Sequence, residues 1–226
     1  MIIEPVAYFR SPLKEKFGIP RQAGLVPELK GEVRFVQPYD AAEALRGLEE
    51  FDYCWLIWGF SLNDSTDFSP TVRPPRLGGN KRTGVFASRS PFRPNGLGLS
   101  CVKLLRVEKK NNGLSRIVGG ADVLSGSPVY DIKPYLPFAD SHPGASEGYS
   151  AQGLEHKLTV SDPDGLLPVL PGGVLSAVKG CLADDPRPSY QNDENRVYAM
   201  VYAGYEIQFT VDGNTLFVPD VKKLSV

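Results

Sequence analysis

Short apolar segments rich in β-branched and aromatic residues, each bounded by Gly, Pro or Asn, dominate the first half of the chain. Segments of this kind favour β-strands joined by tight turns. Many short strands at this spacing predict a mainly β fold with a closed barrel, since closure removes exposed sheet edges. The expected strands are residues 2–10, 32–37, 51–62, 83–88, 97–109 and 114–124.

One helical pattern interrupts these strands. Residues 41–51 carry Ala, Leu and Glu at helical spacing, and Asp40 is the expected N-cap. No internal repeat is visible along the chain.

The C-terminal part has a different pattern. Residues 141–153 are small and polar, which indicates a loop. Residues 157–160 then predict a strand, residues 172–185 an amphipathic helix, and residues 197–219 strands that end in a hairpin at Asp212, Gly213 and Asn214. We therefore expect a barrel domain over residues 1–153 and a small α+β domain over residues 154–226.

Composition is typical of a soluble globular protein, with 42% hydrophobic and 23% charged residues in 226. Cys54, Cys101 and Cys181 are far apart in apolar stretches, which favours buried thiols over a disulfide frame or a metal site. Only two histidines occur, so a zinc site or a histidine-based triad is not expected. The absence of a signal-like start and of a long apolar run predicts a reduced, cytoplasmic, non-membrane protein.

Charge is distributed unevenly. Residues 68–107 carry eight positive side chains and no carboxylate, although the formal charge of the chain is only -1. Such a basic island predicts recognition of a polyanion, and a merely solvated rim explains the missing acids poorly. Pro91 and Pro94 fix Arg89 and Arg93, which are the expected ligand contacts. The expected phosphate contacts are Arg73, Arg76, Lys81 and Arg82.

Gly96 and Gly98 do not form a dinucleotide-binding loop. The third glycine of that motif is replaced by Cys101, and strand-like sequence follows where a helix is needed. A phosphate-binding Gly-Lys-Ser or Gly-Lys-Thr is also absent from the chain. A Rossmann domain is therefore excluded.

Residues 130–140 hold a candidate catalytic pair. Asp131 and Lys133 lie two residues apart and face the same side if the segment is extended. One interpretation is that they neutralise each other at a strand end. The other is that Asp131 accepts a proton while Lys133 and Tyr135 hold a substrate. Aromatic residues of the expected strands, such as Tyr8, Phe9, Trp55, Trp58 and Phe60, are expected in the core, with one or two near a barrel rim free to stack on a base.

Five segments, in the same order, resemble the bacterial TrmO family, also called TsaA or YaeB. They are residues 20–22, 70–80, 87–100, 131–139 and 185–190, so that the likeness covers nearly the whole chain. The resemblance implies an S-adenosylmethionine-dependent tRNA methyltransferase, acting on N6 of threonylcarbamoyladenosine beside the anticodon of threonine tRNA. It also implies a non-Rossmann β-barrel with a small C-terminal domain, and a homodimer with the cofactor near the subunit interface.

The resemblance also implies a set of cofactor-binding residues. This chain departs from the family pattern at two places in the set. Ser61 and Leu62 replace a His-Gln pair of the family, and Ser125 replaces a second Asp. The implied set is Pro20, Arg21, Gln22, Ser61, Leu62, Arg89, Leu99, Asp122, Val123, Leu124 and Ser125.

Methyl transfer to this base requires removal of a proton from a poorly nucleophilic nitrogen. Asp131 is the expected base, and Lys133 is expected to stabilise charge on the adjacent carbonyl. Arg93 or Arg21 would suit the threonyl carboxylate. Arg187 and Tyr190 either grip RNA or a partner subunit, or belong to a turn stapled by prolines.

Two other function classes stay open on the sequence. A non-catalytic barrel that binds S-adenosylmethionine or RNA would act as a regulator. A small-molecule methyltransferase would transfer methyl groups without RNA and without salt-dependent binding.

Overall fold

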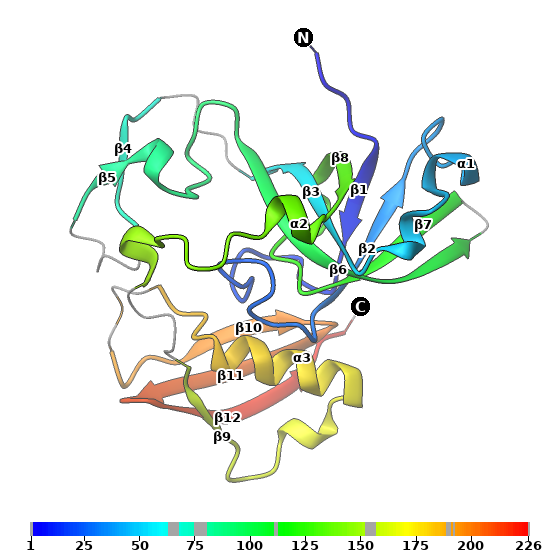
Figure 1. Ribbon diagram of the computed structural model, residues 1–226. Helices are drawn as coiled ribbons and strands as arrows, with labels where there is room; N and C mark the ends of the chain where they lie inside the picture. The colour runs from blue at the N-terminus through cyan, green and yellow to red at the C-terminus, as the bar shows by residue number, and fades with distance from the viewer. Residues whose placement is uncertain are drawn as a thin grey trace.

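Figure 1 shows the computed structural model of the chain. The structure describes residues 2–62, 68–74, 81–110, 113–151, 157–188, 191 and 193–225. A six-stranded barrel forms the upper part of the view, and a four-stranded sheet with a helix lies below it. The prediction of a mainly β chain is confirmed.

The barrel has the strand order β1-β2-β7-β6-β3-β8, and β8 pairs with β1 to close it. All neighbouring strands are antiparallel, and β6 and β7 follow each other directly in sequence. The strands are β1 (Ala7–Arg10), β2 (Lys30–Phe35), β3 (Tyr53–Gly59), β6 (Leu97–Lys110), β7 (Gly113–Gly119) and β8 (Pro128–Pro134).

Alternation along β3 shows how the sequence builds the barrel wall. Cys54, Leu56 and Trp58 are buried in the barrel core, whereas Tyr53 is exposed and Trp55 is half-buried on the outer face. A strand whose side chains alternate in this way has one face on the core and one toward solvent. Functional side chains can therefore sit on either face of the same strand.

Several predicted elements of the barrel are wrong in extent. The strands expected over residues 2–10 and 114–124 are only Ala7–Arg10 and Gly113–Gly119. The expected helix over residues 41–51 is only α1 (Ala42–Leu45), followed by the 3-10 turn η1 (Leu48–Glu50). Gly47 between them has φ 86°, a left-handed conformation that ends an α-helix. Asp40 is not the N-cap, because Ala41 occupies that position without a side-chain cap.

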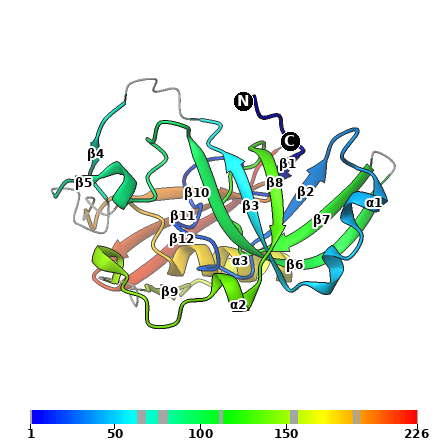
Figure 2. The ribbon, with the colours of Figure 1, turned by 45° about the horizontal axis from the view of Figure 1, so that its top comes forward.

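An arm extends from the barrel between β3 and β6. It contains the short strands β4 (Thr71–Val72) and β5 (Thr83–Gly84) and the 3-10 turn η3 (Val85–Ala87). Figures 1 and 2 both show β4 and β5 set apart from the barrel, on the side opposite α1. The expected strand over residues 83–88 therefore ends at Gly84, where the chain turns.

The C-terminal sheet has the order β10-β11-β12-β9, with β9 parallel to β12 and the other pairs antiparallel. The helix α3 lies across one of its faces (Figure 1) and buries Ala177, Val178, Cys181 and Leu182. The expected helix and the hairpin at Gly213 are both present. The elements are β9 (Thr159–Ser161), η5 (Leu167–Val169), α3 (Gly172–Ala183), β10 (Tyr198–Tyr202), β11 (Tyr205–Asp212) and β12 (Thr215–Lys223), preceded by α2 (Pro137–Asp140) and η4 (Gly148–Ala151).

The segment after β1 connects the two hydrophobic cores. Leu13, Val26 and Leu29 are buried in the core of the C-terminal sheet, although they are close in sequence to the barrel strands β1 and β2. A Cβ atom on Gly180 of α3 would lie 2.5 Å from Val26 Cγ1, which shows how closely this segment packs against the helix. Residues 13–29 are therefore held between barrel and C-terminal sheet.

Candidate active site

A cavity of about 600 Å³ forms where five segments distant in sequence meet. They are the segment after β1, the end of β3, the arm, the start of β6 and the loop after β7. This volume lies within the range of small-molecule binding sites in proteins. Most of the expected cofactor residues line the cavity: Pro20, Arg21, Gln22, Ser61, Leu62, Arg89, Leu99, Asp122 and Leu124.

Val123 and Ser125 do not line this cavity. Val123 points into the barrel core, because it alternates with Asp122 along the loop after β7. The hydroxyl of Ser125 accepts a hydrogen bond from the Ser11 amide at 3.2 Å. The expectation that these two side chains bind the cofactor is therefore corrected, and the Ser125 departure leaves the cavity lining unaltered.

A chain of buried polar groups leads to Asp122. Trp58 Nε1 donates to Ser100 Oγ at 2.9 Å, and Ser100 Oγ donates to Asp122 Oδ1 at 2.5 Å. Burial raises the pKa of Asp122 above its usual range, against the opposing effects of the Ser100 hydrogen bond and the Arg89 charge. Asp122 is thus an oriented hydrogen-bond acceptor at the cavity.

Arginine side chains give the cavity its positive charge. Arg89 Nη1 donates to Gln22 Oε1 at 2.5 Å, so the arm and the segment after β1 are bonded together. Arg93 also lines the cavity, and its Nη1 donates to the Ser88 carbonyl at 3.0 Å. The expected ligand contacts Arg89 and Arg93 therefore share one cavity with the expected cofactor residues.

An aromatic pair forms the apolar side of the cavity. The rings of Trp58 and Phe60 meet edge to face at a centroid distance of 4.5 Å. Gly98 makes room for the indole, since a Cβ atom there would lie 2.3 Å from Trp58 Cε2. A side chain at position 98 would displace the ring that orients Ser100.

We expect Gly98→Ala to destabilise the protein by about 1–3 kcal/mol, because the added methyl overpacks the buried Trp58. Urea unfolding followed by tryptophan fluorescence measures this loss. Gly84→Ala is a matched control, because a Cβ atom there meets nothing within 4 Å and its φ is -60°. Equal unfolding midpoints for the two variants would show that Gly98 is not needed for close packing.

Several cavity residues were not expected from the sequence. Ser100 and Ser127 are almost fully buried, and Ser61 Oγ lies 3.3 Å from Ser127 Oγ. A serine in an otherwise apolar strand, as at position 100, is the signal that could have indicated an inward-facing polar group. The others are Lys16, Ile19, Trp58, Phe60, Ser88, Pro91, Phe92, Leu97 and Gly98.

Asp131 and Lys133 lie outside the cavity, on the outer face of β8. Asp131 Oδ2 and Lys133 Nζ form an ion pair at 3.0 Å, as expected for residues two apart on a strand. Both side chains are about half exposed. This geometry agrees with mutual neutralisation, the structural interpretation that the sequence left open.

Strand register nevertheless connects Asp131 with the cavity. Ile57 of β3 pairs with Leu99 on one side and with Asp131 on the other, so the three side chains form one row on the outer face. Leu99 lines the cavity and is 57% exposed. Two strand spacings, about 10 Å, separate Leu99 from Asp131. A planar group at the cavity edge could span that row.

Aromatic side chains lie beside this row. Trp55 and Tyr135 have ring centroids 5.8 Å apart, and Tyr53 meets Tyr135 at 6.4 Å. Trp55 Nε1 donates to Asp140 Oδ2 at 3.0 Å. Hydrogen bonds from the Leu136 amide and from Trp55 lower the pKa of Asp140. These aromatic rings are on the outer face rather than in the core.

The expected phosphate contacts of the island that the structure describes lie on the arm, whereas its last two basic residues, Lys103 and Arg106, lie on β6. Arg73, Lys81 and Arg82 are exposed, and Arg82 Nε donates to Thr71 Oγ1 at 2.7 Å. Arg76 and Tyr190, two further expected RNA contacts, lie outside the described residues.

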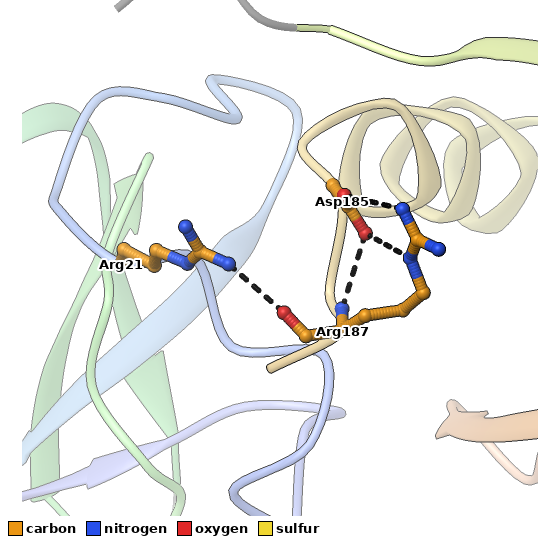
Figure 3. Close-up of polar contacts among 3 residues, drawn as sticks. All are labelled: Arg21, Asp185 and Arg187. Atoms are coloured by element: carbon orange, nitrogen blue, oxygen red, sulfur yellow. Dashed lines mark hydrogen bonds and ion pairs between the residues drawn. The ribbon is translucent and has the colours of Figure 1, made fainter. Parts of the chain in front are cut away.

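Arg187 is not available for RNA. It is only 8% exposed, and its Nε and Nη2 donate to the two carboxylate oxygens of Asp185 at 2.8 and 3.0 Å (Figure 3). Pro186 and Pro188 flank it in the sequence. The expectation that Arg187 contacts RNA is therefore wrong. Arg187 belongs to a rigid turn, the alternative interpretation from the sequence.

Across the described part of the chain, no three His, Cys, Asp or Glu side chains group as metal ligands do. Within the same residues, no helix is long and apolar enough to cross a membrane.

Comparison with known proteins identifies two matching families. Residues 8–141 match the tRNA-methyltransferase O N-terminal domain, and residues 170–224 match the TrmO C-terminal domain. The first match spans the barrel, the arm and the outer-face row, and the second spans α3 and the C-terminal hairpins.

Relatives and solved structures agree with these matches. A protein of Escherichia coli (strain K12) named tRNA (adenine(37)-N6)-methyltransferase is 41% identical over 216 residues, which cover 92% of each chain. A protein of Eikenella corrodens with the same name is 42% identical over 72% of this chain and 92% of its own. The crystal structure of TrmO from Pseudomonas aeruginosa superposes with a TM-score of 0.76 at 30% identity, over 98% of both chains. This chain therefore belongs to the TrmO family.

Proposed function

We propose that the chain is an S-adenosylmethionine-dependent methyltransferase that acts on N6 of an adenosine in tRNA. The observation that carries this proposal is the 600 Å³ cavity, in which Arg89, Asp122 and the segment at residues 20–22 meet. These residues come from separate parts of the chain, and they line one cavity that opens beside the outer-face row. The cytoplasm, where tRNA is found, is the place of the reaction.

The residues present fit S-adenosylmethionine. Trp58, Phe60 and Leu99 offer an apolar wall for the adenine ring. Asp122 would accept hydrogen bonds from ribose hydroxyls or the amino group, and Arg89 would pair with the carboxylate. When bound, the cofactor supplies a methyl group on a positively charged sulfur.

Asp131 and Lys133 act on the accepting base from the same subunit. We propose that the base lies along the row from Leu99 to Asp131, with its N6 between the cavity edge and the Asp131 carboxylate. Asp131 accepts the N6 proton, and Lys133, already paired with it at 3.0 Å, stabilises charge that develops on the neighbouring carbonyl. Trp55 and Tyr135 are placed for stacking on adjacent bases.

The substrate base is threonylcarbamoyladenosine in threonine tRNA. Its threonyl carboxylate requires a cation near the cavity, and Arg93 is one of the two expected candidates that the structure places there. Arg21, the other candidate, also lines the cavity and donates to the Arg187 carbonyl. Arg73, Lys81 and Arg82 on the arm would contact tRNA phosphates, which makes binding salt-dependent.

We assign cofactor binding and proton transfer to residues 1–153 and support of this site to residues 154–226. The active form is a homodimer whose second copy covers the arm. Phe68, Phe86 and Phe92 are exposed apolar residues of the arm, and Phe92 also lines the cavity, so a second copy there would lie next to the cofactor.

Replacing Phe86 by Asp is expected to convert the dimer to a monomer, because a charge is costly in a desolvated apolar contact. Phe86 is 74% exposed within one subunit, so the change should not affect folding. Sedimentation equilibrium at micromolar concentration distinguishes the two states. Phe217→Asp, on the C-terminal sheet, serves as the control; a monomeric parent protein, or a dimeric Phe86→Asp, would refute this contact.

Transfer of labelled methyl groups to purified tRNA tests the proposed function. The protein is incubated with labelled S-adenosylmethionine and tRNA with or without the threonylcarbamoyl modification. Label entering only the modified tRNA supports the proposal. Cofactor binding without transfer would indicate a regulatory binding protein instead, and transfer in the absence of RNA would indicate a small-molecule methyltransferase.

A further inference from the structure

One hydrogen bond joins the cofactor cavity to the turn after α3, in the C-terminal part of the chain. Arg21 Nη2 donates to the backbone carbonyl of Arg187 at 2.9 Å (Figure 3). Arg21 lines the 600 Å³ cavity, whereas Arg187 follows α3. The orientation of a cavity arginine therefore depends on where the turn at residues 185–188 places one carbonyl oxygen.

That turn is held rigidly by its own side chains. The Arg187 guanidinium forms a two-pronged bond with Asp185, and the Arg187 amide donates to Asp185 Oδ1 at 3.3 Å. The side chains of Arg187 and Asp185 are only 9% and 16% exposed. Asp185 has a φ of 52°, a left-handed conformation that Asp tolerates better than most residues. Forked arginine–carboxylate pairs of this kind have a defined geometry.

A second cavity lies behind the same segment. It has a volume of about 370 Å³, and Lys16, Ile19, Pro20 and Arg21 line it together with residues 184–188. The same four residues also line the cofactor cavity. The segment at residues 16–21 thus separates the two cavities. The Arg21–Arg187 hydrogen bond ties this segment to the turn at residues 185–188.

We infer that the Asp185–Arg187 pair positions Arg21 for binding of the methyl donor, so that the turn after α3 contributes to donor affinity without touching the donor. This inference rests on the proposed function, because it takes the larger cavity as the donor site. A free arginine samples many rotamers, and ordering it opposes binding. Arg21 held by the Arg187 carbonyl has lost this freedom before the donor arrives.

Binding of S-adenosylhomocysteine, measured by calorimetry without RNA, tests the inference. We expect Asp185→Asn to raise the dissociation constant about tenfold, the effect of losing one hydrogen bond to a charged group. Asn keeps the tolerance for a left-handed φ but loses the charge. In the methylation assay the loss should fall on the KM for the donor more than on kcat.

Asp220→Asn is the matched control. It breaks the ion pair with Lys222 at 2.6 Å on the same C-terminal sheet, and neither residue lines either cavity. The double variant Arg21→Leu/Asp185→Asn should bind no more weakly than Arg21→Leu alone, because both changes remove the same contact. Additive losses, or equal affinities for Asp185→Asn and Asp220→Asn, would overturn the inference.

Circular dichroism and thermal unfolding show whether Asp185→Asn is folded. If it is not, Arg187→Lys tests the pair from its other member, since lysine cannot form the two-pronged bond with Asp185. A tenfold loss then supports the inference, and an unchanged affinity overturns it. Failure of the parent protein to bind S-adenosylhomocysteine would overturn the proposed function itself, which is a separate outcome.

Discussion

Asp131→Asn is expected to lower kcat for methylation about 100-fold or more, the usual contribution of a positioned general base. Asn keeps the shape of the side chain but cannot accept the N6 proton. Affinity for S-adenosylhomocysteine should be unchanged, because Asp131 does not line the cavity. Single-turnover methylation of modified tRNA, with calorimetry of the same protein, measures both quantities.

The chain contains a close structural control for this variant. Asp220 and Lys222 are also two residues apart on a strand, form an ion pair at 2.6 Å and have similar exposure. Breaking either exposed pair should alter the free energy of unfolding by at most about 1 kcal/mol. Asp220→Asn should therefore retain full activity. If Asp131→Asn also retained it, Asp131 would not be the base, and the pair would only neutralise charge.

Asp122→Asn should lower the affinity for the donor, which Asp131→Asn leaves unchanged. It should not lower the free energy of unfolding. We expect the dissociation constant of S-adenosylhomocysteine to rise about 10- to 100-fold, because Asn is a weaker acceptor than a carboxylate. Asn can still accept the hydrogen bond from Ser100 through its carbonyl oxygen. Calorimetry at neutral pH measures the affinity, and urea unfolding measures the stability.

The pH dependence follows from the raised pKa of Asp122. Burial raises the pKa of the Asp122 carboxyl in the folded state, so the fold favours the protonated carboxyl over the ionised one. Below the unfolded pKa of about 3.9 the carboxyl is protonated in both states, and this contribution to the free energy of unfolding is complete. It is lost as the pH rises through the higher folded value. Relative to the parent protein, Asp122→Asn should therefore gain stability as the pH rises above about 4. A variant less stable than the parent at pH 7 would show that the ionised carboxylate supports the fold.

Local patterns were sufficient for much of the scaffold. The long strand β6 and the helix α3 match their predicted ranges closely. An apolar stretch bounded by Asn and Gly marks β6, and apolar residues at helical spacing mark α3. The helix after β2 failed at Gly47, whose left-handed φ interrupts an otherwise helical composition. The strand β8 was not predicted from its pattern, since prolines at both its ends weaken the strand signal.

The site was less accessible to sequence reasoning, because it depends on contacts between distant segments. The arginines of the arm and the segment at residues 20–22 could be identified as ligand contacts by type. The position of Asp131 could not, because it depends on the register between β3 and β8, which shifts beside Ile57. The burial of Arg187 could not be predicted either, because it depends on the partner Asp185 in a tight turn.

The most direct test of the central claim is a crystal structure of the chain with S-adenosylhomocysteine. We predict the ligand in the cavity between Trp58, Arg89 and Asp122, with its sulfur toward the edge at Leu99. A ligand bound elsewhere, or one bound in the cavity with its sulfur directed away from the outer-face row, would contradict the account.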